Sequence, residues 1–185
     1  MSLEPTITVY CGPMMASKTT HLLVDAERAK FRRDSVVIVK PKIDTRYAAD
    51  SVITHMGLSI AAHSVANADE LREITKNATF VAIDEAFMIR GVADVVMHNF
   101  MRGCSASVST LDMSASCVPF EETMKLLGIA TDVVKLHAVC VHCGANARFT
   151  NAKNGSQPTE RDVKIGGPEV YEPVCYRHHP LLNIK

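Results

Sequence analysis

Short apolar runs alternate with longer stretches of mixed polarity through most of the chain. The runs rich in β-branched residues predict strands at residues 7–11, 35–39, 79–83, 106–111 and 131–136. The stretches between them predict helices at residues 18–33, 92–102 and 120–127, with Gly128 ending the last one. Strands that alternate with helices favour a parallel α/β sheet, which binds ligands at the carboxyl edge of its strands.

The pattern changes near His137, where apolar periodicity gives way to cysteines, glycines and polar loops. We therefore predict two domains, an α/β domain over residues 1–136 and a small appended domain over residues 137–185. The second segment is too short and too rich in loops for a large hydrophobic core. Something other than apolar burial is expected to stabilise it.

Composition narrows the function classes. Twenty basic and twenty acidic side chains balance, so no strong positive field indicates nucleic acid as the main partner. The first residues lack the pattern of a secretory signal, and no apolar run is long enough to span a bilayer, which favours a cytoplasmic location without membrane partners. In a reducing compartment, the six cysteines are better interpreted as metal ligands than as disulfides.

A phosphate-binding loop is predicted between the first strand and the first helix. The segment runs Gly12, Pro13, Met14, Met15, Ala16, Ser17, Lys18, Thr19 and Thr20. It matches the P-loop pattern except that Ser17 replaces the second glycine. Backbone amides at the helix N-terminus would bind phosphates, Lys18 would reach the terminal phosphates of ATP, and Thr19 would ligate Mg²⁺. Ser17 costs on the order of 1 kcal/mol if its φ is positive, and little if its φ is ordinary.

Two acidic residues follow the strand predicted at residues 79–83. One carboxylate at this edge, assigned to Asp84, would bind the Mg²⁺ shell, and its neighbour Glu85 would face the phosphate acceptor. A loop after the second strand adds Asp44, Thr45 and Arg46, which can reach the same phosphates. Acids at strand ends are also common as solvated turn residues, so these assignments depend on the P-loop beside them.

A structural zinc site is predicted in the C-terminal segment. Cys140 and Cys143 form one ligand pair, and Cys175 and His178 form a second, each at the short spacing of a tetrahedral zinc site. His142 and His179 are alternatives at poorer spacing. Four protein ligands leave no open position on the metal, so the zinc would be structural. Cys11, Cys104 and Cys117 are interpreted as small core residues.

Taken in order, these motifs resemble those of the type II, zinc-containing thymidine kinases. The resemblance adds residues 42–47 and 83–86, the pair Leu111 and Asp112, the pair Pro119 and Phe120, and residues 165–171, and it covers roughly residues 6–179. It implies a RecA-like P-loop parallel sheet flanked by helices, followed by a zinc-binding lasso domain. It also implies transfer of the ATP γ-phosphate to the 5′-hydroxyl of thymidine, or of deoxyuridine, in pyrimidine salvage.

The resemblance also assigns residues. Glu85 falls on the family's general base, and residues 12–20, Asp44, Thr45, Arg46 and Asp84 fall on its ATP and Mg²⁺ site. The positions that match the nucleoside site are Met14, Phe87, Phe120, Thr150, Asp162, Val163, Lys164, Ile165, Gly166 and Tyr171. The family implies a homotetramer that is inhibited by the thymidine triphosphate end product.

Three positions depart from the family pattern: Ser17, Phe87 and Ala115. They leave open the shape of the base pocket and the exact nucleoside preference. Two other hypotheses stay open, and the three departures support only the first of them. One is a catalytically degenerate homologue that acts as a nucleotide-binding subunit. The other is a zinc-containing P-loop ATPase that binds nucleic acid, against which the balanced charge argues.

Overall fold

A computed structural model describes residues 4–44, 51–53, 59–153 and 165–182 of the 185-residue chain. Its main helices are α1 (Lys18–Phe31), α2 (Ala68–Thr75), α3 (Val92–Met101) and α4 (Glu121–Ile129), with short 3₁₀ turns η1 (Ala86–Met88) and η3 (Tyr176–His178). Its strands are β1 (Ile7–Gly12), β2 (Val36–Pro41), β3 (Ser51–Ile53), β4 (Ser59–Ala61), β5 (His63–Val65), β6 (Phe80–Ile83), β7 (Ser105–Leu111), β8 (Asp132–Lys135), β9 (Ala138–Val139), β10 (Asn146–Ala147), β11 (Phe149–Ala152) and β12 (Tyr171–Val174). None of the helices in these described ranges is both long and apolar enough to cross a bilayer.

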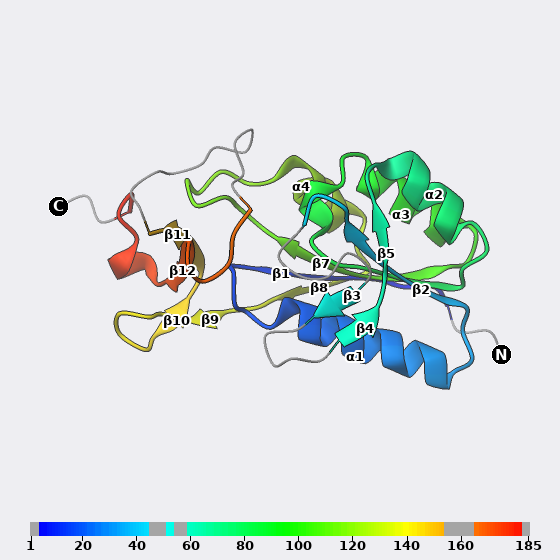
Figure 1. Cartoon of the computed structure of the whole chain (residues 1–185), viewed down its shortest axis with the longest axis horizontal. Helices are drawn as coiled ribbons and strands as arrows, with labels where there is room; N and C mark the ends of the chain where they lie inside the picture. Colours follow the sequence, from blue (N-terminus) through cyan, green and yellow to red (C-terminus); the bar gives the residue numbers. More distant parts are fainter. Residues whose placement is uncertain (1–3, 45–50, 54–58, 154–164, 183–185) are drawn as a thin grey trace.

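A six-stranded parallel sheet forms the centre of the molecule. Its strand order is β5-β2-β6-β7-β1-β8, and every neighbouring pair runs parallel. Figure 1 shows α1 on one face of the sheet and α2, α3 and α4 on the other. Apolar side chains from both faces bury between sheet and helices, and this burial is the main force that holds the layers together. The predicted fold class, an α/β parallel sheet flanked by helices, is confirmed.

The five predicted strands and three predicted helices all form, with small differences at their ends. The prediction that Gly128 ends the last helix was wrong, because α4 continues through Gly128 to Ile129 and ends where Ala130 is extended. Unlike the glycines at helix ends elsewhere in the chain, Gly128 has no positive φ. It is therefore an ordinary helical residue rather than a cap.

Our sequence analysis missed α2, β5 and the β3–β4 hairpin. The signal for α2 was present: Asn67 caps it by accepting a hydrogen bond from the amide of Glu70 at 2.9 Å. The Glu70 carboxylate in turn accepts from the amide of Ala66 at 2.8 Å, so the two residues form a close relative of the capping box. The strands were missed because three-residue runs carry almost no periodicity.

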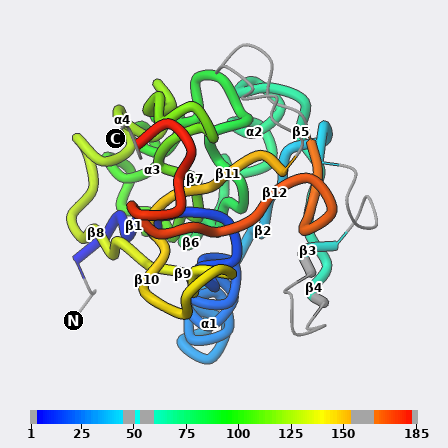
Figure 2. Tube along the Cα trace, turned by 90° about the vertical axis from the view of Figure 1, so that its left-hand side faces the viewer, coloured from blue at the N-terminus to red at the C-terminus, as the bar shows by residue number. Residues whose placement is uncertain are grey.

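The C-terminal segment lies at the carboxyl edge of the sheet. Two small antiparallel sheets, β9 with β10 and β11 with β12, stand beside the end of β1 (Figures 1 and 2). A small cluster of buried apolar side chains stabilises this segment, and it includes Ala16 of the P-loop. The segment thus buries its few apolar side chains partly against the predicted phosphate site.

Candidate active site and metal centre

The loop between β1 and α1 has an unusual backbone. Gly12 has φ +143°, and a Cβ there would lie only 2.4 Å from the carbonyl oxygen of Leu136, so this position requires glycine. Met15 and Ser17 have φ values of 62° and 58°, in the left-handed region. The sequence left two conformations open for Ser17, and the structure adopts the strained, left-handed one. This conformation raises the free energy of a residue with a side chain by on the order of 1 kcal/mol.

The lysine and threonine of the predicted P-loop each make a side-chain hydrogen bond. Lys18 is only 8% exposed, and its Nζ donates to the carbonyl oxygen of Pro13 at 2.7 Å. The hydroxyl of Thr19 donates to Oδ1 of Asp84 at 3.0 Å. The two residues predicted to hold Mg²⁺ are thus in direct contact, although 65 positions separate them in the sequence.

Ser109 on β7 is a member of this site that the sequence analysis missed. Its buried hydroxyl also donates to Oδ1 of Asp84, next to the bond from Thr19. Two hydroxyl donors on one carboxylate oxygen fix the orientation of that carboxylate. The available signal was the alternation of Ser105, Ser107 and Ser109 with Ala106 and Val108, which is a weak pattern.

This loop forms part of the wall of a polar hollow. It contains about 620 Å³ of empty space and is lined by Met14, Met15, Ala16, Ser17, Lys18, Thr19, Thr20, Lys40, Asp44, Ser51, Val52, Asp84 and Glu85. The predicted residues Thr45 and Arg46 lie outside the described residues. Lys40 was not assigned any role from the sequence, yet it forms part of this wall.

A second, more apolar hollow of about 480 Å³ lies next to the first. Its lining is Met14, Glu85, Phe87, Met88, Leu111, Met113, Ser114, Ala115, Phe120, Thr150, Ile165, Gly166 and Tyr171. The rings of Phe87 and Phe120 lie 4.4 Å apart between centroids. All the described residues that were predicted to contact the nucleoside line this hollow, whereas Asp162, Val163 and Lys164 fall outside the described residues.

Glu85 and Met14 line both hollows, so they mark the boundary between them. Glu85 has φ 48° and ψ 43°, a left-handed conformation that is uncommon for a residue with a side chain. Such strain is frequent at functional sites, where the surrounding structure holds it in place. The arrangement presents one carboxylate to two adjoining binding spaces, which suits proton transfer between ligands in the two hollows.

Thr150 contacts the P-loop as well as the apolar hollow. Its hydroxyl accepts a hydrogen bond from the amide of Met14 at 3.1 Å, and both residues are buried. This bond joins β11 to the loop after β1 across 136 positions of sequence. A hydrogen bond therefore links the predicted phosphate loop directly to the C-terminal segment.

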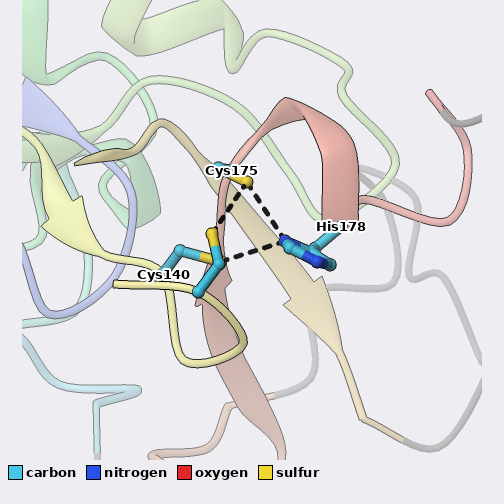
Figure 3. Close-up of side chains that lie close together, drawn as sticks. Cys140, Cys175 and His178 are labelled. Carbon is cyan, nitrogen blue, oxygen red and sulfur yellow. Dashed lines mark hydrogen bonds between the residues drawn. The ribbon is translucent and has the colours of Figure 1, made fainter. Parts of the chain in front are cut away.

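The four predicted zinc ligands come together. The ligand atoms of Cys140, Cys143, Cys175 and His178 all lie within 4.8 Å of one another. Sγ of Cys143 lies 3.7 Å from Sγ of Cys175, and Nδ1 of His178 lies 3.6 Å from Sγ of Cys140 and 3.2 Å from Sγ of Cys175. Zinc–ligand bonds of about 2.3 Å to sulfur and 2.0 Å to nitrogen at a tetrahedral angle separate ligand atoms by roughly 3.5–3.8 Å. Figure 3 shows Cys140, Cys175 and His178 pointing toward a common point.

The two alternative histidines make other contacts. Nε2 of His142 lies 3.4 Å from Oε1 of Glu172, and Nε2 of the fully buried His179 lies 3.7 Å from Sγ of Cys117. His178 is therefore the histidine of the cluster. Cys11 and Cys104 are buried as expected, and burial raises the pKa of the Cys104 thiol to about 11. Cys117 is only partly buried and does not join the core clusters of the described residues, so its interpretation as a small core residue was wrong.

Comparison with a family model and with known proteins points to one family. A family model described as thymidine kinase matches residues 5–179. The thymidine kinases of Bacteroides fragilis (strain YCH46) and Bacteroides thetaiotaomicron (strain ATCC 29148) are each 36% identical to this chain over 170 residues. Each of these matches covers 91% of this chain and 84% of the relative.

Proposed function

Because this chain belongs to the thymidine kinase family and is therefore a kinase, we propose that it transfers the γ-phosphate of ATP to the 5′-hydroxyl of thymidine. The observation that carries the proposal is the position of Glu85, which lines both the polar hollow around the P-loop and the apolar hollow beside it. ATP phosphates would occupy the first hollow and the nucleoside the second, with the reacting atoms meeting at Glu85.

The P-loop provides the phosphate site in this proposal. Backbone amides at the start of α1 and the Lys18 ammonium would bind the triphosphate, since both place positive charge where phosphate oxygens would lie. Thr19 and Asp84 would hold Mg²⁺, because their oxygens already lie 3.0 Å apart and oxygen atoms are the ligands that this ion prefers. When bound, the ion would neutralise charge on the transferring phosphate.

Glu85 is the proposed general base. A nucleoside hydroxyl attacks phosphorus poorly until its proton is removed, and a carboxylate at the boundary of the two hollows is placed to accept that proton. Its left-handed backbone conformation supports this assignment, since such strain is frequent at functional sites. Lys18 would stabilise the negative charge that spreads over the phosphate oxygens during transfer.

The apolar hollow is the proposed nucleoside site. Phe87, Phe120 and Tyr171 supply aromatic surface for a flat base, and Met14 can adapt to its edge because the methionine side chain is flexible. Deoxyuridine, which lacks only the base methyl group, would also fit such a site. The Cys140, Cys143, Cys175 and His178 cluster would hold a structural Zn²⁺, whose four protein ligands leave no position for catalysis.

The experiment that tests the proposal is Glu85→Gln. Loss of the base should lower the turnover of ATP with thymidine roughly 10²- to 10⁴-fold while leaving the binding of both substrates largely unchanged. Glu121→Gln, at an exposed glutamate of α4, is the matched control and should keep normal turnover. Near-normal turnover of the Glu85 variant would refute the assigned role. A wild-type chain that binds ATP but turns over no nucleoside would support the degenerate homologue instead.

We propose two domains, residues 1–136 and residues 137–185. An apolar cluster formed mainly by residues after 136 supports this division. A homotetramer fits the exposed edge strand β8, whose four residues include the exposed Val133 and Val134. Inhibition by the thymidine triphosphate end product and a cytoplasmic location stay predictions from the family.

A further inference from the structure

Lys40, at the end of β2, is buried in an unusual place. Only 2% of the residue is exposed, yet it lines the polar hollow that the P-loop forms. A lysine is rarely this buried unless its charge is balanced by nearby groups, because removing an ammonium from water is costly. A buried lysine in the wall of an anion-binding hollow therefore suggests a ligand-related role.

The order of the strands places Lys40 opposite the P-loop lysine. β6, which ends beside Asp84, lies between β2 on one side and β7 and β1 on the other. Lys18 follows β1 and its Nζ donates to the carbonyl oxygen of Pro13 at 2.7 Å. Lys40 lies near the end of β2, and its Nζ donates to the carbonyl oxygen of Ser51, on β3, at 3.4 Å. A ligand in the hollow would thus have one ammonium on each side of Asp84.

The charges of the residues that line the hollow favour a second cation in its wall. The described lining contains three carboxylates, Asp44, Asp84 and Glu85, against the two lysines. A polyphosphate that enters this space brings further negative charge into a region where carboxylates already predominate. Among the described lining residues, loss of Lys40 would leave one ammonium against three carboxylates and the incoming phosphates, and electrostatic repulsion would oppose binding.

We propose that Lys40 is a second phosphate-binding cation, which contacts the terminal phosphates of the nucleotide from the side opposite Lys18. The inference rests on the proposed function only in taking the ligand of the P-loop to be a nucleoside triphosphate. Lys40 then contributes to the preference of the site for a triphosphate over nucleotides with fewer phosphates.

The test compares Lys40→Met with Lys42→Met, an exposed lysine two residues later on the same segment. Direct binding of ATP and ADP is measured by calorimetry, and the free energy of unfolding is measured without ligand. Loss of a charge-assisted contact should weaken ATP binding roughly 10- to 100-fold and ADP binding less. Thymidine binding should not change, and Lys42→Met should bind ATP as the wild type does.

A purely structural lysine would give a different result. Lys40→Met would then lower the free energy of unfolding without changing the ratio of ATP to ADP affinity, and that outcome would overturn the proposal. ATP affinity within twofold of the wild type would also overturn it. If the wild-type chain itself fails to bind ATP, the proposed function is refuted rather than the role of Lys40.

A second measurement needs no substitution and so cannot fail through misfolding. An acyl phosphate of ATP carries a reactive carbonyl on its terminal phosphate. A lysine Nζ that reaches this carbonyl attacks it, an amide forms, ATP leaves and a proton is released. Mass spectrometry should then find acylated Lys40 in the wild-type protein, with labelling blocked by excess ATP. Labelling of Lys18 without Lys40 would refute the predicted contact.

Discussion

The hydrogen bond between Thr150 and the P-loop gives a sharp prediction about how the C-terminal segment supports the phosphate site. Thr150→Val keeps nearly the same shape but removes the hydroxyl that accepts from the amide of Met14. Both residues are buried, so this amide would lose its partner without gaining water. Leaving a buried donor unsatisfied costs about 1–3 kcal/mol. For a chain of this size, that loss corresponds to a fall in Tm of about 2–12 °C.

Two assays measure the effect. Urea denaturation monitored by circular dichroism gives the change in the free energy of unfolding, and steady-state kinetics give the KM for ATP. The valine variant should be less stable by about 1–3 kcal/mol and should also show a raised KM for ATP, because the P-loop backbone loses an anchor. Thr150→Ser is the matched control, since it keeps the hydroxyl and loses one buried methyl group, at about 0.8 kcal/mol.

Comparison of the valine and serine variants shows whether the Thr150 hydroxyl acts through the P-loop. If the hydroxyl matters through the P-loop, the serine variant keeps the wild-type KM for ATP while the valine variant does not. A valine variant with wild-type stability and an unchanged KM would refute the reasoning, because it would mean that the Met14 amide finds another acceptor at no cost.

Two further predictions concern the backbone strain and the metal. Ser17 has φ 58°, so Ser17→Gly should be more stable than Ser17→Val by at least about 1 kcal/mol in urea denaturation, because a β-branched residue is disfavoured there; equal stabilities would contradict the strained geometry. Cys143→Ser removes one ligand at an exposed position, so it should abolish stoichiometric zinc, measured by atomic absorption, and lower the Tm with little loss of packing. Cys117→Ser, outside the cluster, should keep its zinc, and zinc retention by the Cys143 variant would argue against that ligand.

Several local features were predictable because their signals lie within short windows of sequence. The glycine and lysine of the P-loop, the acids after a buried strand and the two ligand pairs each depend on residues a few positions apart. The helix α2 could have been predicted too, since Asn67 and Glu70 have the spacing of a capping motif. The β3–β4 hairpin could not, because strands of three residues show no usable alternation.

The sequence by itself determined the alternation of strands and helices, the glycine and lysine pattern of the predicted phosphate loop and the three clustered cysteines, since local propensity and spacing encode them. The tertiary structure alone decided which distant groups meet. Ser109 reaches Asp84 because β6 and β7 are neighbours in the sheet, and Nζ of Lys40 reaches the carbonyl oxygen of Ser51 on β3. The contact of Thr150 with Met14 and the choice of His178 over His179 likewise depend on how the C-terminal segment packs against the sheet edge. No local pattern records such contacts, because they arise from the free energy of packing whole elements together rather than from the conformational preferences of neighbouring residues.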